Sequence, residues 1–548
     1  MSIRDKVTRR EFFRDAAAAG VVATAAATLG PRVVHAAPGI PDKWDAEADV
    51  IVVGTGVAGY AAAIEAADAG ATVLMIEKMK FVGGNSILAG GNCMMPVNHL
   101  QKKAGIEDHV EWAFEDYYNN GEHRAVPEIL NVFIKGAGDT ALWFEKLGIV
   151  WRGPTMQNPD NRVPRTLRPD VSKTYQGANG LSLIDVLNQN AVKRQIPIKL
   201  EHKLTQLIRP DPAGPVLGVV VQNAGKTLNF KAKKAVVLAT GGYKANHRMC
   251  RAWHPLLDEQ FNWSGGPYTQ TTGDGAFAAM AVGAGLGDAS WPCSFIIKWG
   301  SPIYSLWEPQ TFDTEIISAG LPYKVGNSSV MLVENDGKRW INEFIFNPGD
   351  AELFKPSIAA YLDLPKRPRN VWAIVDSNGA ADMGWKPEQF TDPTKQKNPY
   401  LDPKWIATAD TIAGLATKMG IPAAGLQATV AKYNLCVDPD FDRPTPYSPI
   451  VKAPFFAAKM APMMHDQSSG IRVNTKMQII DQNFQQADSD ALSVAIDKEP
   501  VIPHLYGAGE FCNGLFGAAR GSGKMGAYVV LGRVAGKAAV TEKAWDAV

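Results

Sequence analysis

Hydrophobic positions near the start of the chain predict a strand, a tight turn, a helix and a second strand. Residues 49–53 form a short apolar run that is typical of a buried strand. The glycine-rich segment 54–59 follows at once, and residues 61–69 are alanine-rich and end at a glycine, as helices often do. Residues 72–76 are a second apolar run, which the acidic Glu77 closes. The pattern therefore predicts a βαβ unit.

Three glycines in the turn meet the physical requirements of dinucleotide binding. Gly54 permits a tight turn, Gly56 lets a pyrophosphate approach the backbone, and Gly59 lets the helix pack closely on the strand. The helix N-terminus presents free N–H groups and a positive dipole end to the phosphates. Glu77 lies 18 residues after Gly59, where its carboxylate can accept the ribose hydroxyls. We therefore expect a dinucleotide site.

Three later segments favour FAD over NAD. Residues 80–91 form a second glycine-rich loop soon after the acidic residue, which suits a larger cofactor that lies along the chain. Residues 234–242 are typical of another strand that ends in glycines. Residues 504–510 repeat this arrangement near the C-terminus, before a helical pattern over 524–537.

The first residues are typical of an export signal rather than of a folded domain. Residues 8–14 contain a twin-arginine motif, an alanine-rich run over 16–29 follows, and a small-residue cleavage site ends at Ala36. That run is too short and too weakly apolar to span a bilayer, and no later segment qualifies. We expect residues 1–36 to be a twin-arginine signal peptide of a periplasmic protein. The alternative is an amphipathic helix of the folded domain.

Size, charge and cysteine spacing exclude several classes of protein. A chain of 548 residues, 46% of them hydrophobic, is too long for one ordinary core and too apolar to be mostly disordered. Its 56 basic and 55 acidic residues give a net charge of +1, so no nucleic-acid partner is expected. The five cysteines form no Cys-x-x-Cys pair, so nothing supports haem c, an iron–sulfur cluster or zinc. We expect no metal, and cysteines that are mostly buried and free.

On these motifs the chain resembles the flavoprotein family of fumarate reductases, succinate dehydrogenases and 3-ketosteroid dehydrogenases. The resemblance covers essentially the whole chain after the predicted signal. The stretches that carry it are residues 54–59, 83–86, 89–91, 239–242, 272–275, 337–343 and 506–510, together with a cap signature between Thr411 and Asn434.

The resemblance implies an α/β fold with a Rossmann-like FAD-binding domain that is split in sequence, over residues 45–290 and 455–548. An α+β capping domain, residues 291–454, is inserted between the two parts. The proline-rich stretch 438–454 agrees with a linker at the second boundary.

The resemblance also implies which residues bind FAD. Covalent members of the family carry a histidine in the loop after the second strand. Residues 83–86 contain none and His99 lies well beyond them, so we expect non-covalent FAD. The helix that begins near Lys524 is expected to aim its N-terminus at the flavin, and it fits a packing role as well. The predicted FAD-binding residues are Gly54, Gly56, Val57, Ala58, Gly59, Glu77, Lys78, Gly84, Asn85, Ser86, Ala89, Gly90, Gly91, Thr240, Gly241, Asp274, Gly509, Glu510 and Met525.

Alignment by eye with soluble fumarate reductases shows where this chain departs from them in the substrate site. The histidine that holds one substrate carboxylate falls on Phe295, and the glutamate of the proton relay falls near Tyr323. The arginine that donates the proton falls on Asn347, and a second substrate histidine falls on Asp466. Only the late carboxylate-binding arginine is kept, as Arg520.

These departures change the substrate that we expect. A second carboxylate placed against Phe295 would lose its water without gaining a partner, which costs several kcal/mol. Fumarate itself is therefore not expected. The aromatic residues around Phe295 either line an apolar pocket for a larger ligand or belong to the core of the capping domain. They are Trp291, Trp299, Tyr304 and Trp307.

Three residues are candidates for catalysis, each with a structural alternative. Arg520 is expected to hold a carboxylate or polarise a carbonyl, and its alternative is a structural salt bridge. His465 is a candidate acid or base, or else a structural histidine. Tyr323 is a candidate proton donor, or else an ordinary buried tyrosine. Arg339 lies in a structural motif of the family and is assigned to the scaffold.

We therefore expect an FAD-dependent oxidoreductase that reduces or desaturates a carbon–carbon bond next to a carboxyl or carbonyl group, on an aryl-acrylate-like substrate. The alternatives are a 3-ketosteroid-type dehydrogenase that acts on a bulky ketone, and a non-catalytic FAD-binding redox partner. The chain has no second dinucleotide motif. Electrons are therefore expected to pass to or from an external carrier, a cytochrome or a quinone.

Overall fold

The computed structural model describes most of the chain after residue 38. The predicted signal peptide lies outside the described residues, as do Tyr323, Asn347 and Arg520. No helix among the described residues is long and apolar enough to cross a membrane. The described residues are 39–156, 161–170, 179–253, 262–263, 270–287, 293–299, 330–343, 364, 371–382, 406–438, 440–443, 447–467, 469–482, 495–517 and 523–545.

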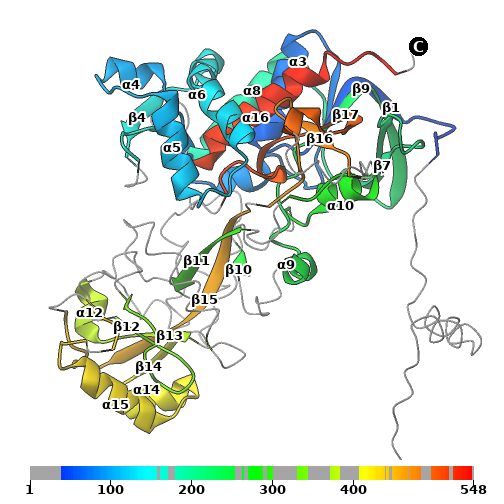
Figure 1. Cartoon of the computed structure of the whole chain (residues 1–548). Helices are drawn as coiled ribbons and strands as arrows, with labels where there is room; N and C mark the ends of the chain where they lie inside the picture. Colours follow the sequence, from blue (N-terminus) through cyan, green and yellow to red (C-terminus); the bar gives the residue numbers. More distant parts are fainter. Residues whose placement is uncertain are drawn as a thin grey trace, which may run out of the picture.

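The larger sheet is built from segments near both ends of the described chain (Figure 1). Strands β17, β9, β1, β2 and β6 are parallel neighbours, so their carboxyl ends lie at one edge of the sheet. The central strand β1 is buried on both faces, which explains its continuous apolar run. The eight strands are β1 (Ala46–Val53), β2 (Val73–Ile76), β6 (Ile198–Lys199), β7 (Lys203–Ile208), β8 (Gly218–Asn223), β9 (Lys226–Leu238), β16 (Gln478–Ile480) and β17 (Val501–Gly507).

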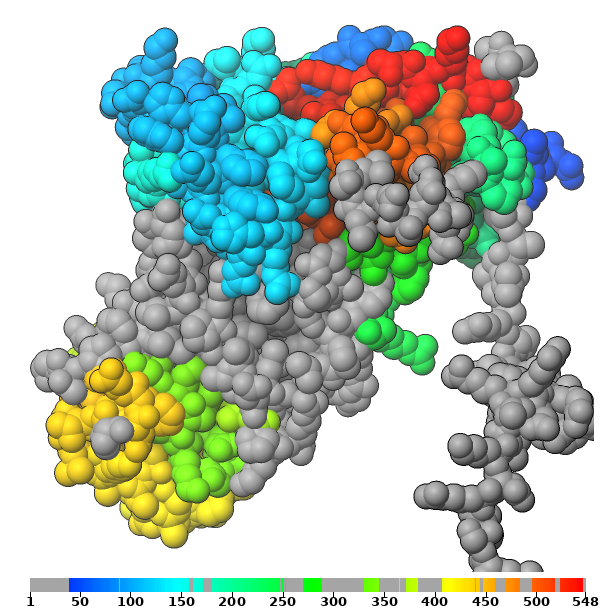
Figure 2. Space-filling model, in the orientation of Figure 1, coloured from blue at the N-terminus to red at the C-terminus, as the bar shows by residue number. Residues whose placement is uncertain are grey.

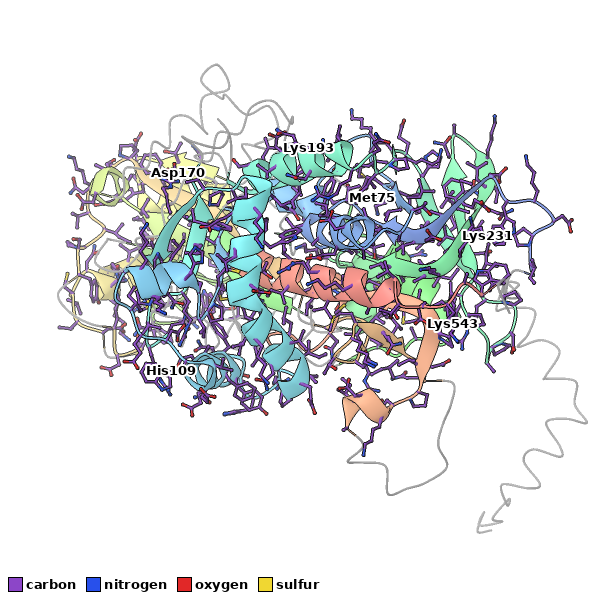
Figure 3. All side chains as sticks on the ribbon, turned by 90° about the horizontal axis from the view of Figure 1, so that it is seen from above. Met75, His109, Asp170, Lys193, Lys231 and Lys543 are labelled. Carbon is purple, nitrogen blue, oxygen red and sulfur yellow. The ribbon has the colours of Figure 1, made fainter. Side chains whose placement is uncertain are left out.

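Two helices from opposite ends of the chain pack side by side against this sheet (Figure 3). Gly532 and Gly536 bring α16 so close to α3 that a methyl group on either would clash with a carbonyl oxygen, of Ala58 or Ala62 respectively. Because these two contacts advance together along both helices, α3 and α16 run parallel. The helices are α3 (Val57–Asp68) and α16 (Lys524–Ala539), and α6 (Pro127–Leu147) crosses α16.

A buried ion pair fixes the position of α16 against its neighbours. Arg533 Nε donates to Glu65 Oε1 at 2.5 Å, and its Nη1 donates to Thr140 Oγ1 at 2.9 Å. The guanidinium also lies 5.1 Å from the ring centroid of Trp143. Arg533 therefore joins α16 to both α3 and α6, and breaking such a buried pair is costly because one charge stays unpaired.

The second sheet lies apart from the first and packs against helices of its own (Figure 1), and the yellow residues in Figure 2 lie at the lower left, away from the blue and red residues. Strand β15 lies in its middle and pairs with β10, β11, β13 and β14. The apolar core beneath includes Met331, Trp372, Leu415 and Tyr433. The predicted fold class, α/β with an inserted capping domain, is confirmed. The elements are β10 (Asn262–Trp263), β11 (Cys293–Trp299), β12 (Met331–Val333), β13 (Val371–Val375), β14 (Ile406–Ala409), β15 (Phe455–Gln467), α12 (Ser377–Asp382), α14 (Ile412–Met419) and α15 (Ala423–Tyr433).

Strand β15 connects the two parts of the molecule. It begins at Phe455, where the second FAD-binding segment is predicted to start, yet it pairs with the second sheet as far as Gln467. Figure 1 shows it running from the second sheet towards the first. The short strand β10 joins the second sheet from within the predicted first FAD-binding segment. The domain boundaries stay a prediction, and strand pairing extends the second sheet beyond them.

A buried ion pair inside the capping domain supports the assignment of Arg339 to the scaffold. Its Nη2 donates to Glu343 Oε2 at 2.6 Å and to Asp438 Oδ2 at 2.7 Å, and the three side chains are almost fully buried. Arg443 Nη1 donates to the same Glu343 oxygen at 3.2 Å and to Tyr433 Oη at 2.7 Å. These contacts join the segment after β12 to the segment after α15, so Arg339 has a structural role.

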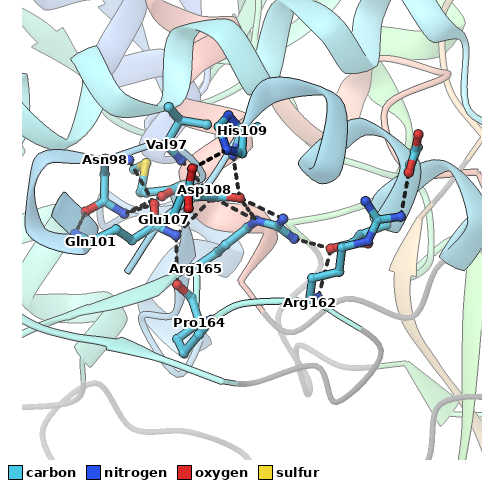
Figure 4. Close-up of polar contacts among 12 residues, drawn as sticks. Val97, Asn98, Gln101, Glu107, Asp108, His109, Arg162, Pro164 and Arg165 are labelled. Atoms are coloured by element: carbon cyan, nitrogen blue, oxygen red, sulfur yellow. Dashed lines mark hydrogen bonds and ion pairs between the residues drawn. The ribbon is translucent and has the colours of Figure 1, made fainter. Parts of the chain in front are cut away.

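Another buried arginine, Arg165, joins a small three-stranded sheet to the helices beside it (Figure 4). Arg165 donates from Nε to Asp108 at 2.9 Å, and from Nη1 to Asp116 at 2.6 Å. Burial alone would raise the pKa of Asp108, but hydrogen bonds from Arg165 and from Val97 N–H hold it below its usual value. The Arg165 carbonyl accepts a hydrogen bond from Met95 N–H, so the cluster also anchors the segment that follows the short strand β3 (Cys93–Met94).

The remaining elements surround the first sheet. The third sheet has the order β3-β5-β4, with β5 in the middle. These elements are β3 (Cys93–Met94), β4 (Trp151–Thr155), β5 (Thr166–Pro169), α4 (His99–Lys103), α5 (Val110–Asn120), α8 (Asn179–Lys193), α9 (His247–Trp253), α10 (Asp274–Ala281) and the 3-10 helices η1 (Gly84–Leu88), η6 (Ile496–Lys498) and η7 (Gly509–Phe511).

The prediction of free, mostly buried cysteines is confirmed for the four cysteines whose side chains are described. Cys93, Cys250 and Cys512 are buried, and Cys436 is partly exposed. Burial raises the pKa of Cys250 to about 12. The described residues hold no group of three or more histidine, cysteine, aspartate or glutamate side chains that could bind a metal.

Replacing Arg165 with methionine should destabilise the protein by about 3–5 kcal/mol, because two carboxylates lose their buried partner. Urea denaturation followed by circular dichroism measures the change. The control is R194M, because Arg194 pairs with the half-exposed Asp68 and the loss should be less than about 1 kcal/mol. Equal losses in the two variants would contradict the role of the Arg165 cluster.

Candidate functional site

The turn between β1 and α3 is closed by glycines that approach other backbone atoms. Gly54 has a φ of +104°, and a methyl group there would clash with the carbonyl oxygen of Ala239 at the end of β9. A methyl group on Gly59 would clash with the carbonyl oxygen of Gly54. Side chains are therefore excluded at Gly54 and Gly59, as the sequence predicts. The N-cap Gly56 makes no side-chain capping bond, and Val57 N–H donates to Ser86 Oγ at 3.2 Å.

Glu77 links the first glycine turn to the second glycine-rich loop. Its Oε2 accepts hydrogen bonds from Thr55 N–H at 3.1 Å and from Thr55 Oγ1 at 2.7 Å. Its Oε1 accepts from Met79 N–H at 3.0 Å. Thr55 Oγ1 in turn accepts from Gly83 N–H at 3.0 Å. The carboxylate is thus held at the carboxyl end of β2, beside the turn that is predicted to hold a pyrophosphate.

Two predicted site residues from distant segments form an ion pair. Lys78 Nζ lies 2.6 Å from Asp274 Oδ2, at the start of α10, and 2.5 Å from Thr272 Oγ1. Burial lowers the pKa of Lys78, although Asp274 opposes this. Burial pushes the pKa of Asp274 upwards, but the positive charge and hydrogen bond of Lys78 more than offset it. The pair closes one side of the edge where the parallel strands end.

Buried polar atoms at this edge lack a partner within the described residues. Gln270 Nε2 donates to Asn85 Oδ1 at 2.6 Å, whereas Gln270 Oε1 is buried without a hydrogen bond. Thr240 Oγ1, which follows β9, is also buried and unpaired. Buried polar atoms normally have partners, so these two fit a site that is completed by a ligand. Together with the glycine turn, they fit an FAD cofactor.

The third glycine segment meets the first at the start of α3. Gly509 has a φ of +75°, and a methyl group there would lie 2.7 Å from the Ala58 side chain. The next residue, Glu510, accepts hydrogen bonds on Oε1 from Lys244 Nζ at 3.2 Å and from Gln467 N–H at 3.1 Å. The predicted residues of three distant segments are therefore brought to one edge of the sheet.

The N-termini of α3 and α16 point the same way but are offset along the helix axis. Both helices have a glycine N-cap without a side-chain capping bond. Gly532 lies against Ala58, so α16 extends eight residues before this contact and α3 extends one. At 1.5 Å per residue, the two N-termini are offset by roughly 10 Å. Two positive helix ends suit an extended cofactor that places a pyrophosphate near α3 and a ring that gains negative charge on reduction near α16.

The backbone next to the N-terminus of α16 is fixed by β3. Met94 N–H donates to the carbonyl oxygen of the N-cap Gly523 at 2.8 Å, and Met525 is buried in the first turn. Gly523 has a φ of +111°, and a methyl group there would lie 2.7 Å from Met94 Cγ. The Arg165 cluster anchors the same strand one residue later, so it supports this helix end indirectly.

Backbone register places several predicted substrate residues next to one another. On β11 and β15, Ser294 lies opposite Asp466 and Phe295 lies opposite Met464. His465 is therefore the extra residue of a β-bulge, a feature that often redirects a side chain beside an active site. Two residues later, Gln467 N–H donates to Glu510. The strand end that carries His465 thus reaches Glu510, one of the predicted FAD-binding residues, while Arg520 and Tyr323 lie outside the described residues.

Several residues at this edge were not predicted from the sequence. Thr55 lies inside the glycine motif, and its position between two glycines is the only local signal for it. Lys244, Gln270 and Gln467 have no motif of their own, and folding alone brings them to the site.

Comparison with known proteins agrees with this geometry. The sequence model of the family described as FAD binding domain matches residues 49–525. The chain is 30% identical to urocanate reductase of Eggerthella lenta, over 91% of this chain and 76% of that protein. It is 28% identical to the acrylate reductase flavoprotein subunit of Shewanella woodyi, over 98% of this chain and 99% of that protein. The structure of the open conformation of a flavocytochrome c3 fumarate reductase matches with a TM-score of 0.70 and 25% identity, over 98% of this chain and 82% of that one.

Replacing Gly54 with alanine should weaken FAD binding about 100-fold, because about 3 kcal/mol is lost when the turn opens to relieve the clash with Ala239. G70A is a matched control, since Gly70 also has a positive φ, of +85°, but has nothing within 4 Å of its added methyl group. The dissociation constant of FAD, from fluorescence titration of the apoprotein, measures both. Equal weakening in the two variants would show that backbone strain, and not the close approach, controls binding.

Proposed function

The chain belongs to the family described as FAD binding domain, and we propose that it reduces a carbon–carbon double bond next to a single carboxylate. We propose a substrate that is larger and more apolar than fumarate. The protein is an FAD-dependent oxidoreductase that acts on CH–CH groups. Its substrate, its electron carrier and its export to the periplasm are what we propose.

Bound FAD supplies a flavin ring that exchanges a hydride with the substrate carbon. The N-terminus of α3 is suited to hold the pyrophosphate, and Glu77 is suited to accept the ribose hydroxyls. The N-terminus of α16 places a positive potential at the flavin end of the site. The loop after β2 holds no histidine, so we propose that the cofactor is not covalently attached.

The register of β11 and β15 is the single observation that carries the substrate proposal. It brings the position of Phe295 next to the bulge at His465, on the strand that reaches Glu510. In our alignment by eye, Phe295 replaces a carboxylate-binding histidine of the fumarate reductases. A site in which an aromatic residue replaces one carboxylate-binding histidine, while Arg520 is kept, suits one carboxylate and one apolar group.

The names of two relatives support a substrate with one carboxylate. Urocanate and acrylate, which name the reductases of Eggerthella lenta and Shewanella woodyi, each carry one carboxylate beside the double bond. We propose that Arg520 binds that carboxylate and stabilises the negative charge that develops on it as the β carbon accepts a hydride. We propose His465 as the acid that delivers the α proton, with Tyr323 as the alternative donor.

An external carrier, a cytochrome or a quinone, is proposed to supply the electrons. The sequence has one dinucleotide motif, so nothing indicates a second nucleotide site. A relative from Shewanella frigidimarina is named fumarate reductase (cytochrome), which supports a cytochrome as the first candidate to test.

We expect anaerobic assays with a reduced viologen dye to show faster turnover of cinnamate or urocanate than of fumarate. The ratio of kcat/KM should reach about 100, because an unpaired second carboxylate costs about 3 kcal/mol or more. Androstenedione in the same assay tests the steroid alternative. Preferred turnover of fumarate would contradict the one-carboxylate site, and a reduced flavin that no substrate reoxidises would favour a redox partner.

The variant R520A should lower kcat/KM for the preferred substrate by about 100-fold or more, because the developing charge loses its partner. The control R194A removes an arginine whose partner Asp68 is half-exposed on the opposite end of α3, and turnover should not change. Turnover of R520A within about threefold of the parent would contradict the assignment, since about 0.6 kcal/mol is too little for a charge clamp.

We propose that the protein is exported to the periplasm by the twin-arginine route. Replacing Arg9 and Arg10 with lysine should retain the flavoprotein in the cytoplasm, because the receptor reads the arginine pair. Cell fractionation and immunoblotting measure its distribution. The control replaces Lys6 with arginine, outside the pair, and should leave export unchanged. Periplasmic protein from the double-lysine variant would contradict this route.

A further inference from the structure

Lys244 is a buried cation at the carboxyl edge of the first sheet, and none of the roles above uses it. The residue is 3% exposed, although lysine is seldom buried without a partner. Its Nζ lies 3.2 Å from Glu510 Oε1, and the Glu510 side chain is 11% exposed. The two residues are 266 positions apart, so the pair exists only because the fold brings two glycine segments together.

The turn that carries Lys244 is fixed by its neighbours. Ala245 N–H donates to the Thr271 carbonyl at 2.9 Å, and Tyr243 N–H donates to Gln467 Oε1 at 2.5 Å. The Tyr243 hydroxyl lies 2.6 Å from Ser469 Oγ. Because the backbone is held on both sides, the Lys244 ammonium is directed at Glu510 by a rigid segment.

The position of Glu510 places this charge pair among the FAD-binding residues. Glu510 Oε2 lies 3.9 Å from the position that a methyl group on Gly241 would take, at the end of β9. Gly509, which precedes it, contacts Ala58 in the first turn of α3. The pair therefore stands where three parallel strands end, and because both side chains are largely buried, their charges would act on bound FAD through protein rather than through bulk water.

Charge balance at this edge affects how strongly the site prefers reduced FAD. Two-electron reduction adds negative charge to the flavin, and an unpaired carboxylate nearby would oppose it in a medium of low dielectric constant. We propose that Lys244 is a positioning and charge-compensating residue, which neutralises Glu510 and thereby raises the reduction potential of bound FAD. This inference needs the cofactor, which family membership provides, and it is independent of the identity of the substrate.

The test is the midpoint potential of the FAD-loaded enzyme, measured by slow reduction in the presence of reference dyes. In K244M the affinity ratio of reduced over oxidised FAD should fall about tenfold, which for a two-electron couple is about 30 mV. K244R keeps the charge and should stay close to the parent. The control K233M removes a partly exposed lysine that pairs with Glu47 on the same domain, and its potential should not change.

A second pair of variants keeps the test decisive if K244M does not retain FAD. E510Q removes the carboxylate and leaves the lysine charge, so its potential should lie above that of the parent. Adding K244M to E510Q removes that charge. The affinity ratio of reduced over oxidised FAD should then fall about tenfold below the E510Q value, which for a two-electron couple is a potential about 30 mV lower. Equal potentials for E510Q and the double variant, or for K244M and the parent, would overturn the proposal and leave Lys244 with a packing role.

Discussion

Close approach of backbone to backbone at the carboxyl edge of one parallel sheet is the constraint on which the rest of the structure depends. Gly54, Gly59 and Gly509 each lie where a side chain would strike a neighbouring segment. Because these segments meet so closely, N–H groups, helix ends and a few charged side chains converge on one narrow region. A cofactor held there is surrounded by groups whose orientation the fold has already determined, so little reorganisation is required on binding.

Buried and partly buried ion pairs hold the segments that surround this region. Arg533 with Glu65 joins helices from the two ends of the chain, and Lys78 with Asp274 closes the edge near β2. A buried pair contributes little net stability when a hydrophobic replacement packs equally well, but it strongly disfavours arrangements that separate its charges. The two pairs therefore disfavour arrangements that move α16 away from α3, or the segment after β2 away from the start of α10.

The local parts of the fold were predictable from the sequence, and the long-range parts were predictable only through the resemblance. The unit from β1 to Glu77 follows from apolar periodicity and glycine spacing, because its strand, turn, helix and second strand lie within one short stretch of sequence. Lys78 and Asp274 were assigned through the family, and their pairing was not anticipated. Nothing in the sequence around Lys244 indicates that it meets Glu510. Strand pairing also carries the second sheet past the boundary expected from the prolines before Phe455, because β15 begins there and pairs with that sheet as far as Gln467. His465 was proposed from alignment, and its place at a bulge depends on the register of β11, which no local pattern specifies.

The strand order of the first sheet has a consequence for how the protein is made. β17 lies beside β9, and α16 rests on α3, so the last fifty residues complete a layer whose other members were synthesised first. While the ribosome adds the intervening segments, residues 236–238 of β9 lack the neighbour that β17 later provides, and α3 keeps one apolar face uncovered. The cofactor cradle is half-built for most of translation, and it closes only after the C-terminal helix has left the exit tunnel. Chaperones that shield apolar surfaces therefore have a long interval in which to act on the nascent chain, and a premature stop late in the gene removes the cradle together with the tail.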